Sequence, residues 1–213
     1  MREIANEKKT DFVEAIGEAA FYGPKLDFLA NDSLGRQWQV ATIQLDMNMP
    51  DRFELECTSE EGKPERIVMI HTAIMGSIER FLSLLIEHYA GNFPLWIAPE
   101  QVVIIPVGDS KSKSDGSDTI GENNGERHHK EATLLYEKLR SLGVRVSVDL
   151  SDIGFGKKIR QAKTSRAPYF VIIGDKDLEA GKVTLESRDH GQIGQVTADE
   201  LIARLTKEIK EKK

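Results

Sequence analysis

The chain has 213 residues, of which 39% are hydrophobic and 30% are charged, and its mean hydropathy is -0.38. These values are typical of a soluble globular protein with one large or two small domains, without the roughly 18-residue apolar run that spans a bilayer. The net charge of -6 argues against a dedicated nucleic-acid binder but leaves room for a local basic patch. The single cysteine, Cys57, excludes an internal disulfide and a cysteine-cluster zinc site. Residues 1–17 lack the apolar core of a signal peptide, so we expect a cytoplasmic location.

The first part of the chain has the pattern of antiparallel strands. Residues 1–18 are polar and predict a short helix or a frayed lead-in. Residues 19–30 and 36–47 are strand-like, and the Asn-, Asp- and Gly-containing segment 31–35 between them favours a turn. The sequence therefore predicts a β-hairpin.

A second antiparallel pair and a helix are expected next. Residues 53–59 and 65–73 are strand-like and flank a cluster of turn residues. An amphipathic helix follows and ends near residues 90–91, where Gly91 suits a left-handed cap. Its apolar face carries Ile78, Phe81, Leu82, Leu85 and Tyr89. Residues 92–101 hold two prolines and read as a crossover between domains.

Strands and helices alternate in the rest of the chain, which predicts an α/β domain with a partly parallel sheet. The expected elements are a strand at 102–107, a long polar loop at 108–129, a helix at 130–143, a strand at 144–150, a helix at 154–166, a strand at 167–174, a hairpin at 182–197 and a helix at 198–210. We therefore expect two domains, residues 1–97 and 98–213.

The string HTAIMGSIERF at residues 71–81 allows two interpretations. In the structural one, which periodicity alone favours, Ser77 is a helix N-cap and Arg80 is a solvated surface charge. In the functional one, the helix N-terminus attracts an anion, and Arg80 binds a phosphate or stacks on a base. His71 would then be a general acid/base or a metal ligand, although one histidine does not make a metal site.

A polar strand face offers a similar choice. Tyr22 and Lys25 lie in a tight turn that enters a strand, and Thr42, Gln44 and Asp46 alternate with apolar residues in TIQLD. Such a face is either exposed or lines a pocket, and alternation by itself favours exposure.

Five strings, in this order and spacing, resemble the last part of the class II catalytic core of threonyl-tRNA synthetase. They are AFYGPKLDF, GRQWQVATIQLDM, PDRFEL, VMIHTAIMGSIERFLSLLIEHYAG and FPLWIAP. GSIERFLSLLIEH resembles class II motif 3, which implies that Arg80 is the catalytic arginine that contacts ATP. VDLSDIGFGKKIRQAKTSRAPYFVIIGDKD is similar to the class IIa anticodon-binding domain, and the resemblance covers residues 18–213.

The resemblance implies an α/β (α+β) fold, in which a truncated antiparallel class II sheet with the motif 3 helix precedes an α/β anticodon-binding domain with a mixed sheet. It places His71 where the family has one of three zinc ligands, and that zinc holds the amino group and hydroxyl of threonine. It also places Tyr22, Lys25, Gln44 and Ser77 in the pocket for threonine and adenylate.

Several family features differ or lie upstream. The other two zinc ligands and motifs 1 and 2 are not in this chain, Cys57 is not in a ligand position, and Thr72 replaces an arginine. The chain alone is therefore expected to hold half an active site and no zinc. The residues implied to meet the anticodon are Gly156, Lys158, Arg160 and Arg166. The family commonly has Asn, Glu and Arg where this chain has Asp152, Asp177 and Glu186.

The resemblance implies a ligase that uses ATP with Mg²⁺ to join threonine to tRNA-Thr in protein biosynthesis. The intact family enzyme is a homodimer with zinc, and no membrane is involved. The alternative is a catalytically inactive RNA-binding or regulatory module derived from a class II synthetase. A third reading is a half-enzyme that pairs with a separately encoded N-terminal half.

Overall fold

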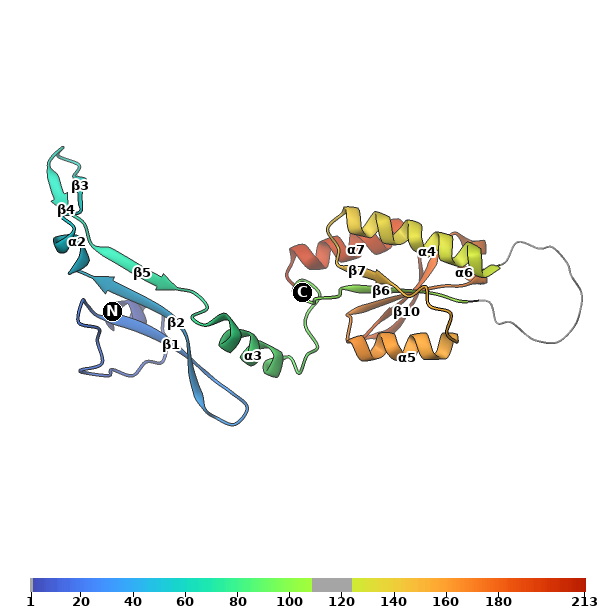
Figure 1. Cartoon of the computed structure of the whole chain (residues 1–213), viewed down its shortest axis with the longest axis horizontal. Coiled ribbons are helices and arrows are strands. Elements are labelled where there is room, and N and C mark those ends of the chain that lie inside the picture. Colours follow the sequence, from blue (N-terminus) through green and yellow to red (C-terminus); the bar gives the residue numbers. More distant parts are fainter. Residues whose placement is uncertain (1, 109–123) are drawn as a thin grey trace, which may run out of the picture. The chain divides into compact units, whose positions relative to one another are not determined.

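The computed structural model describes residues 2–108 and 124–213, which fold as two compact units (Figure 1). The first unit ends at His88 and the second begins at Tyr89. Residues 89–97, which the sequence analysis placed in the first domain, lie in the second unit. There Leu95 is buried in the core, and the Trp96 backbone N–H donates to the Lys213 carbonyl at 3.2 Å.

The first unit is built on a three-stranded antiparallel sheet in the order β1-β2-β5. The predicted hairpin is confirmed as β1 (Lys25–Asn31) and β2 (Gln37–Asp46), and β5 (Met69–Ala73) pairs with the other edge of β2. In register, Gln44 lies opposite Lys25 on one side and His71 on the other. Since cross-strand partners point to the same face, these three side chains are neighbours.

Two details of the first unit differ from the prediction. Residues 65–73 form two strands: β4 (Pro64–Arg66) pairs with β3 (Glu56–Thr58), whereas β5 joins the main sheet. The four-residue helix α2 (Met49–Arg52) was not predicted, because a single turn leaves no periodic pattern. The lead-in contains the short helix α1 (Arg2–Glu7).

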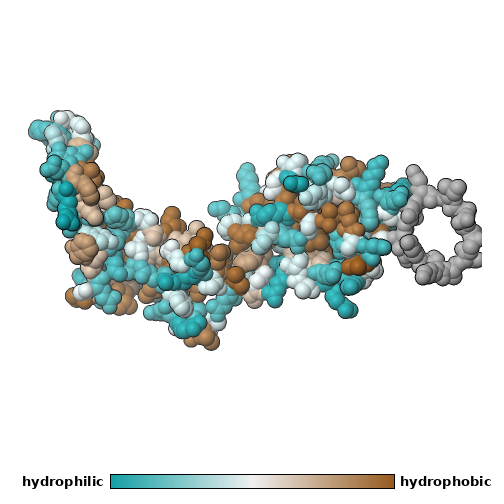
Figure 2. Space-filling model, viewed as in Figure 1, coloured by the Kyte–Doolittle hydropathy of each residue, from teal (hydrophilic) through white to brown (hydrophobic). Residues whose placement is uncertain are grey.

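Helix α3 (Ile78–His88) is amphipathic, yet none of its residues is buried. The Ser77 hydroxyl accepts the Arg80 backbone N–H at 3.4 Å, a weak form of the predicted N-cap. The helix is followed by left-handed residues, with φ of 48° at Ala90 and 76° at Gly91. Its apolar side stays partly uncovered, and Figure 2 shows hydrophobic surface over this unit.

The second unit contains a five-stranded mixed sheet in the order β10-β9-β8-β6-β7. Strand β6 (Val102–Pro106) runs parallel to β7 (Val146–Val148) and β8 (Tyr169–Ile173). Strand β9 (Val183–Ser187) is antiparallel to β8 and forms a hairpin with β10 (Gly191–Val196). The predicted α/β domain with a mixed sheet is confirmed.

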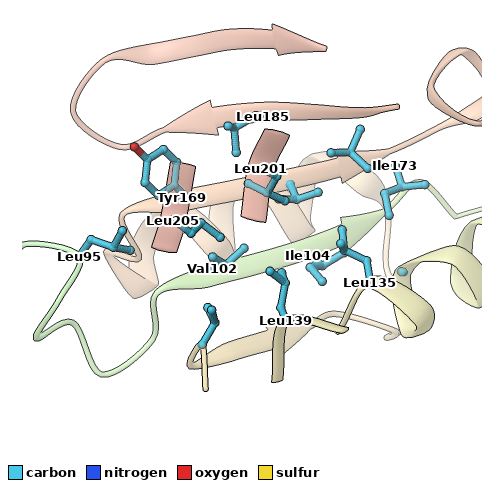
Figure 3. Packing of buried hydrophobic residues seen from close by; sticks show 14 residues of the cluster. Leu95, Val102, Ile104, Leu135, Leu139, Tyr169, Ile173, Leu185, Leu201 and Leu205 are labelled. Atoms are coloured by element: carbon cyan, nitrogen blue, oxygen red, sulfur yellow. The ribbon is translucent and has the colours of Figure 1, made fainter. Parts of the chain in front are cut away.

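Helices cover both faces of this sheet (Figure 1). Side chains of α4 (Asn124–Ser141) and α7 (Ala198–Lys210) pack with Val102 and Ile104 in the main core (Figure 3). Helix α5 (Phe155–Ser165) packs on the opposite face, against Val103 and Ile105. The alternation along β6 thus divides the core into two layers, as expected for a strand buried on both faces.

Two helical segments of the second unit were not foreseen. The prediction of a loop at 108–129 was wrong for residues 124–129, which form the start of α4. Residues 109–123 of that predicted loop lie outside the described residues. His128 explains the difference, because its buried ring contacts the Val107 carbonyl at 2.6 Å and the Asp175 carboxylate at 3.1 Å. Helix α6 (Asp175–Ala180) was missed because it has only six residues.

Candidate functional site

A polar depression of about 710 Å³ lies on the sheet of the first unit. Its polar lining consists of Glu18, Lys25, Asp27, Gln39, Thr42, Gln44, His71 and Thr72. Three of the predicted site residues, Lys25, Gln44 and His71, are thus brought together. Tyr22 joins them, since its hydroxyl donates to Gln44 Oε1 at 2.9 Å.

Lys25 and Asp27 form an ion pair within the depression. Lys25 Nζ lies 2.6 Å from Asp27 Oδ2, while Asp27 Oδ1 accepts from Thr42 at 2.7 Å and from Gln39 at 2.8 Å. Burial opposes the charge of Asp27, but the hydrogen bonds from Lys25 and Thr42 outweigh it, so its pKa is lowered. The hydrogen bond to Asp27 in turn raises the pKa of Lys25. Asp27 was not predicted as a site residue, although its position two residues after Lys25 puts both on one strand face.

His71 is held by a buried carboxylate. Its Nε2 lies 2.8 Å from Asp46 Oδ2, and the Asp46 side chain is only 2% exposed. The other oxygen of Asp46 accepts the backbone N–H groups of Asn48 and Met49 at 2.9 Å each. The Met49 N–H is the main cause that lowers the pKa of Asp46. Because Asp46 is charged and occupies Nε2, His71 presents Nδ1 as its free ligand atom.

The described residues do not form a complete metal site. Within residues 2–108 and 124–213, no group of three His, Cys, Asp or Glu side chains has the spacing to hold a metal. The carboxylate of Asp46 holds one ring nitrogen of His71, as carboxylates do for most zinc-binding histidines. Further ligands would have to come from outside this group.

Arg80 lies at the start of α3, next to the depression. Its Nη1 donates to the carbonyl of Gln39, a lining residue, at 3.0 Å. In the described part of the chain its guanidinium forms no ion pair, so its charge is available to an anion. Ser77, one turn earlier, donates to Glu79 at 2.8 Å. Neither Arg80 nor Ser77 lines the depression itself.

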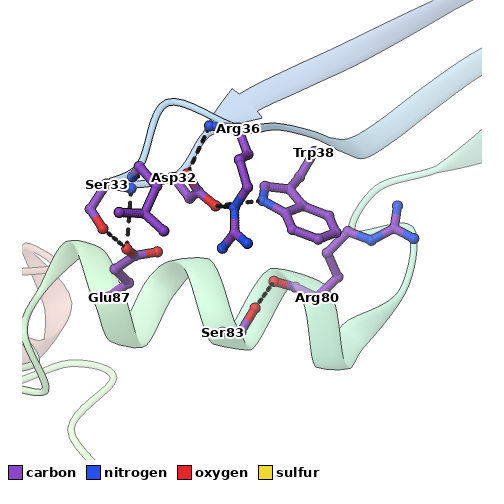
Figure 4. A network of polar contacts seen from close by, with 8 residues as sticks. Asp32, Ser33, Arg36, Trp38, Arg80, Ser83 and Glu87 are labelled. Carbon is purple, nitrogen blue, oxygen red and sulfur yellow. Dashed lines mark hydrogen bonds and ion pairs between the residues drawn. The ribbon is translucent and has the colours of Figure 1, made fainter.

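The hairpin of β1 and β2 contacts α3 near both ends of that helix (Figure 4). Near one end, the guanidinium carbon of Arg80 lies 5.7 Å from the centroid of the Trp38 ring. Near the other, Glu87 accepts hydrogen bonds from the backbone N–H and the hydroxyl of Ser33. The turn itself is organised by Asp32, whose side chain is 2% exposed.

Asp32 makes the first unit sensitive to acid. The Trp38 indole N–H, with help from Arg36 and Leu34, outweighs burial and lowers the pKa of Asp32 to about 2, from 3.8. The unfolded chain therefore binds the proton first, and the stabilising contribution of Asp32 is lost as pH falls from about 4 toward 2. We expect Asp32→Asn to destabilise the first unit at pH 7 and to have a much smaller effect near pH 2.

Urea unfolding checks this expectation. The chain has two tryptophans, so a Trp96→Phe background leaves Trp38 as the remaining one. Its fluorescence then reports unfolding of the first unit. An equal cost of Asp32→Asn at pH 7 and pH 2.5 would contradict the assigned role.

The predicted anticodon residues occupy different environments on and beside α5. Gly156 and Arg160 are exposed on the helix. Lys158 is instead 1% exposed and donates to the Asp149 carbonyl at 3.0 Å, so its predicted contact with RNA is replaced by a bond that holds the 149–154 loop. Arg166 is the left-handed C-cap residue, with φ of 60°, and donates to the Ala90 carbonyl.

The departures from the family pattern also have structural partners. Asp177 is buried and accepts hydrogen bonds from the Gly174 backbone, Thr184 and Gln195, at 2.7–3.1 Å. Glu186 forms a 2.7 Å ion pair with Lys163 of α5, which offsets the reversed charge. Asp152 is exposed.

Comparison with known proteins accounts for both units. Residues 101–208 match the family model described as the anticodon binding domain. The chain belongs to the anticodon-binding domain family. Residues 2–89 match the model of the tRNA synthetase class II core domain (G, H, P, S and T). These two matches confirm the class II core and the anticodon-binding domain that the resemblance implies.

The relatives found by sequence are named as threonine–tRNA ligases. One from Prosthecochloris aestuarii is 42% identical over 212 residues, and one from Thermosynechococcus vestitus is 47% identical over 191 residues. These alignments cover 100% and 90% of this chain but only 30% and 29% of the relatives. The chain thus spans about three tenths of the length of the curated relatives it matches.

Solved structures show the same similarity. The RNA binding domain of threonyl-tRNA synthetase from Cryptosporidium parvum superimposes with a TM-score of 0.82 at 32% identity, over 97% of this chain and 48% of that one. A putative threonyl-tRNA synthetase from Aeropyrum pernix superimposes with a TM-score of 0.70 at 31% identity, over 99% of this chain and 46% of that one. Among the described residues, no helix combines the length and the apolar character that a membrane span requires.

Proposed function

We propose that this chain supplies part of the catalytic core and the anticodon-binding domain of a threonyl-tRNA synthetase. Such an enzyme uses ATP and Mg²⁺ to activate threonine and then joins it to tRNA-Thr. The observation that supports this most is the similarity to threonine–tRNA ligases along the whole chain, across both units. We further propose that the intact protein is a cytoplasmic homodimer.

In this proposal Arg80 binds ATP. Its guanidinium carries a permanent charge, has no carboxylate partner among the described residues, and is anchored through Gln39 beside the depression. Lys25 and Gln44 line the depression and supply a charged donor and an amide to threonine and adenylate. Tyr22 orients Gln44, and Ser77 caps the helix that carries Arg80.

His71 would contribute one ligand to a zinc ion. The zinc, when bound, supplies a Lewis acid that recognises the amino group and hydroxyl of threonine. Asp46 fixes the imidazole by holding Nε2 and leaves Nδ1 toward the ligand. Removing Asp46 would therefore weaken zinc binding without removing a ligand.

The exposed side of α5 would meet the anticodon arm. Gly156 and Arg160 offer backbone and a guanidinium to phosphates and to unstacked bases. Phe155, at the start of the helix and 37% exposed, adds an aromatic ring for stacking that the sequence analysis did not single out. Lys158 acts indirectly, through the 149–154 loop.

Binding of a tRNA-Thr transcript to this chain tests the proposal for the second unit. We expect binding that weakens with salt and is reduced when the anticodon is replaced. Equal affinity for tRNA-Thr and for an unrelated tRNA would instead favour the alternative, a general RNA-binding module without specific anticodon reading.

Arg160 and Lys158 are expected to affect this binding differently. Arg160→Ala removes one exposed charge, so the slope of log affinity against log salt should become shallower by about 0.7 to 0.9. Lys158→Met keeps the buried stem and removes only the bond to Asp149, so affinity should fall while the slope stays unchanged. A shallower slope for Lys158→Met would show that its ammonium contacts phosphate after all.

A further inference from the structure

Two arginines lie near the Trp38 ring, and they differ in whether they form an ion pair. Arg36 and Arg80 both lie near the indole, with guanidinium carbons 5.6 and 5.7 Å from its centroid, and Figure 4 draws the ring between them. Arg36 Nε is ion-paired to Asp32 at 2.6 Å. Arg80 has no such partner among the described residues, so the aromatic face and the Gln39 carbonyl are what hold its head group.

The indole is itself fixed by a buried acceptor. Trp38 Nε1 donates to Asp32 Oδ2 at 3.0 Å. The same carboxylate accepts from the backbone N–H groups of Leu34 at 3.0 Å and Arg36 at 2.8 Å. A charged acceptor with this many donors has one favourable orientation, so it fixes the plane of the ring as well as the turn.

This arrangement matters because an arginine side chain is flexible. Holding its guanidinium against an aromatic face limits its rotamers before a ligand arrives, which reduces the entropy lost on binding. The guanidinium still has N–H donors beyond the one given to Gln39. Trp38 therefore orients the charge without neutralising it, which a carboxylate in the same place would not do.

We propose that Trp38, anchored by Asp32, is a positioning residue that preorganises Arg80 for the nucleotide. The link to nucleotide binding rests on the proposed function, whereas the ordering of Arg80 by Trp38 does not. Residues 31–38 of the hairpin then stabilise the position of Arg80 at the start of α3. The hydrogen bond from Ser33 to Glu87 holds this part of the hairpin against the helix.

The first test needs no nucleotide and uses this chain. In ¹⁵N-labelled protein, the Arg80 Nε–Hε signal is assigned by its loss in Arg80→Lys, and its ring-current shift and heteronuclear NOE are measured. We expect Trp38→Leu to abolish the shift and mobilise the side chain, and Trp38→Phe to retain part of both. Trp96→Phe, in the second unit, is the matched control and should change neither. An Arg80 signal that is as shifted and as ordered in Trp38→Leu as in the wild type would overturn the inference.

The second test uses the full-length protein that carries this chain and measures ATP–pyrophosphate exchange. We expect Trp38→Leu to raise KM for ATP about 2- to 5-fold with KM for threonine unchanged, and Trp38→Phe to recover most of the loss. A fall in kcat alone would mean that Trp38 only supports folding, which overturns the inference. If Arg80→Ala leaves KM for ATP unchanged, the proposed role of Arg80 fails, and the NMR result still decides whether Trp38 orders it.

Discussion

Replacing Arg80 with alanine is expected to raise KM for ATP and to lower kcat in threonine-dependent ATP–pyrophosphate exchange. The combined loss in kcat/KM should be about 10²- to 10³-fold, the usual cost of removing a preorganised group that binds the phosphates and stabilises developing charge. The physical reason is local. Arg80 is a permanent cation beside the polar depression and forms no ion pair in the described residues. Removing it leaves the phosphates without a fixed positive partner at this position.

A matched variant separates this effect from a general loss of charge. Arg52→Ala removes an exposed arginine of the same unit, at the end of α2 and outside the depression, and should leave exchange unchanged. Arg80→Lys keeps the charge but loses the planar fork and should recover only part of the activity. Full activity in Arg80→Ala would contradict the assignment of an ATP site.

Replacing Leu205 with alanine is expected to destabilise the second unit by about 2–5 kcal/mol. Leu205 lies on α7, is fully buried, and packs with Val102, Leu139 and Tyr169 in the main core (Figure 3). The deleted methyl groups leave a cavity under a close-packed sheet, which relaxes only in part.

Urea unfolding of a Trp38→Phe background measures this loss, because Trp96 then reports the second unit alone. Leu134→Ala is the control, since Leu134 is on α4 but 56% exposed, and should change stability by no more than about 0.5 kcal/mol. Equal costs for the two variants would mean that the core is not packed as described.

The sequence was sufficient for elements with a long or regular pattern. The hairpin of β1 and β2, the strand β6 and the helix α7 follow from alternation, apolar runs and helical periodicity. The elements that were missed, α2 and α6, are too short to show a period. The split of residues 65–73 between β4 and β5 depends on partners distant in sequence, which no local pattern reveals.

The candidate site was predictable in part, for similar reasons. The family resemblance identified His71, Lys25 and Gln44, which the sheet register then brings together. The hydrogen bond between His71 on β5 and Asp46 on β2 joins residues that are 25 positions apart, so the sequence alone did not indicate it. Lys158 could have been placed correctly, because it shares the buried face of α5 with Ala162, one turn later.

The central claim is tested most directly by the activity of the native protein. An antibody against residues 124–213 would purify it from its source cells, and ATP–pyrophosphate exchange would be measured with threonine, with valine, and after zinc chelation. We expect exchange with threonine that chelation abolishes, and little with valine. Recovered protein that shows no threonine-dependent exchange would contradict the synthetase assignment and favour an RNA-binding module without catalysis.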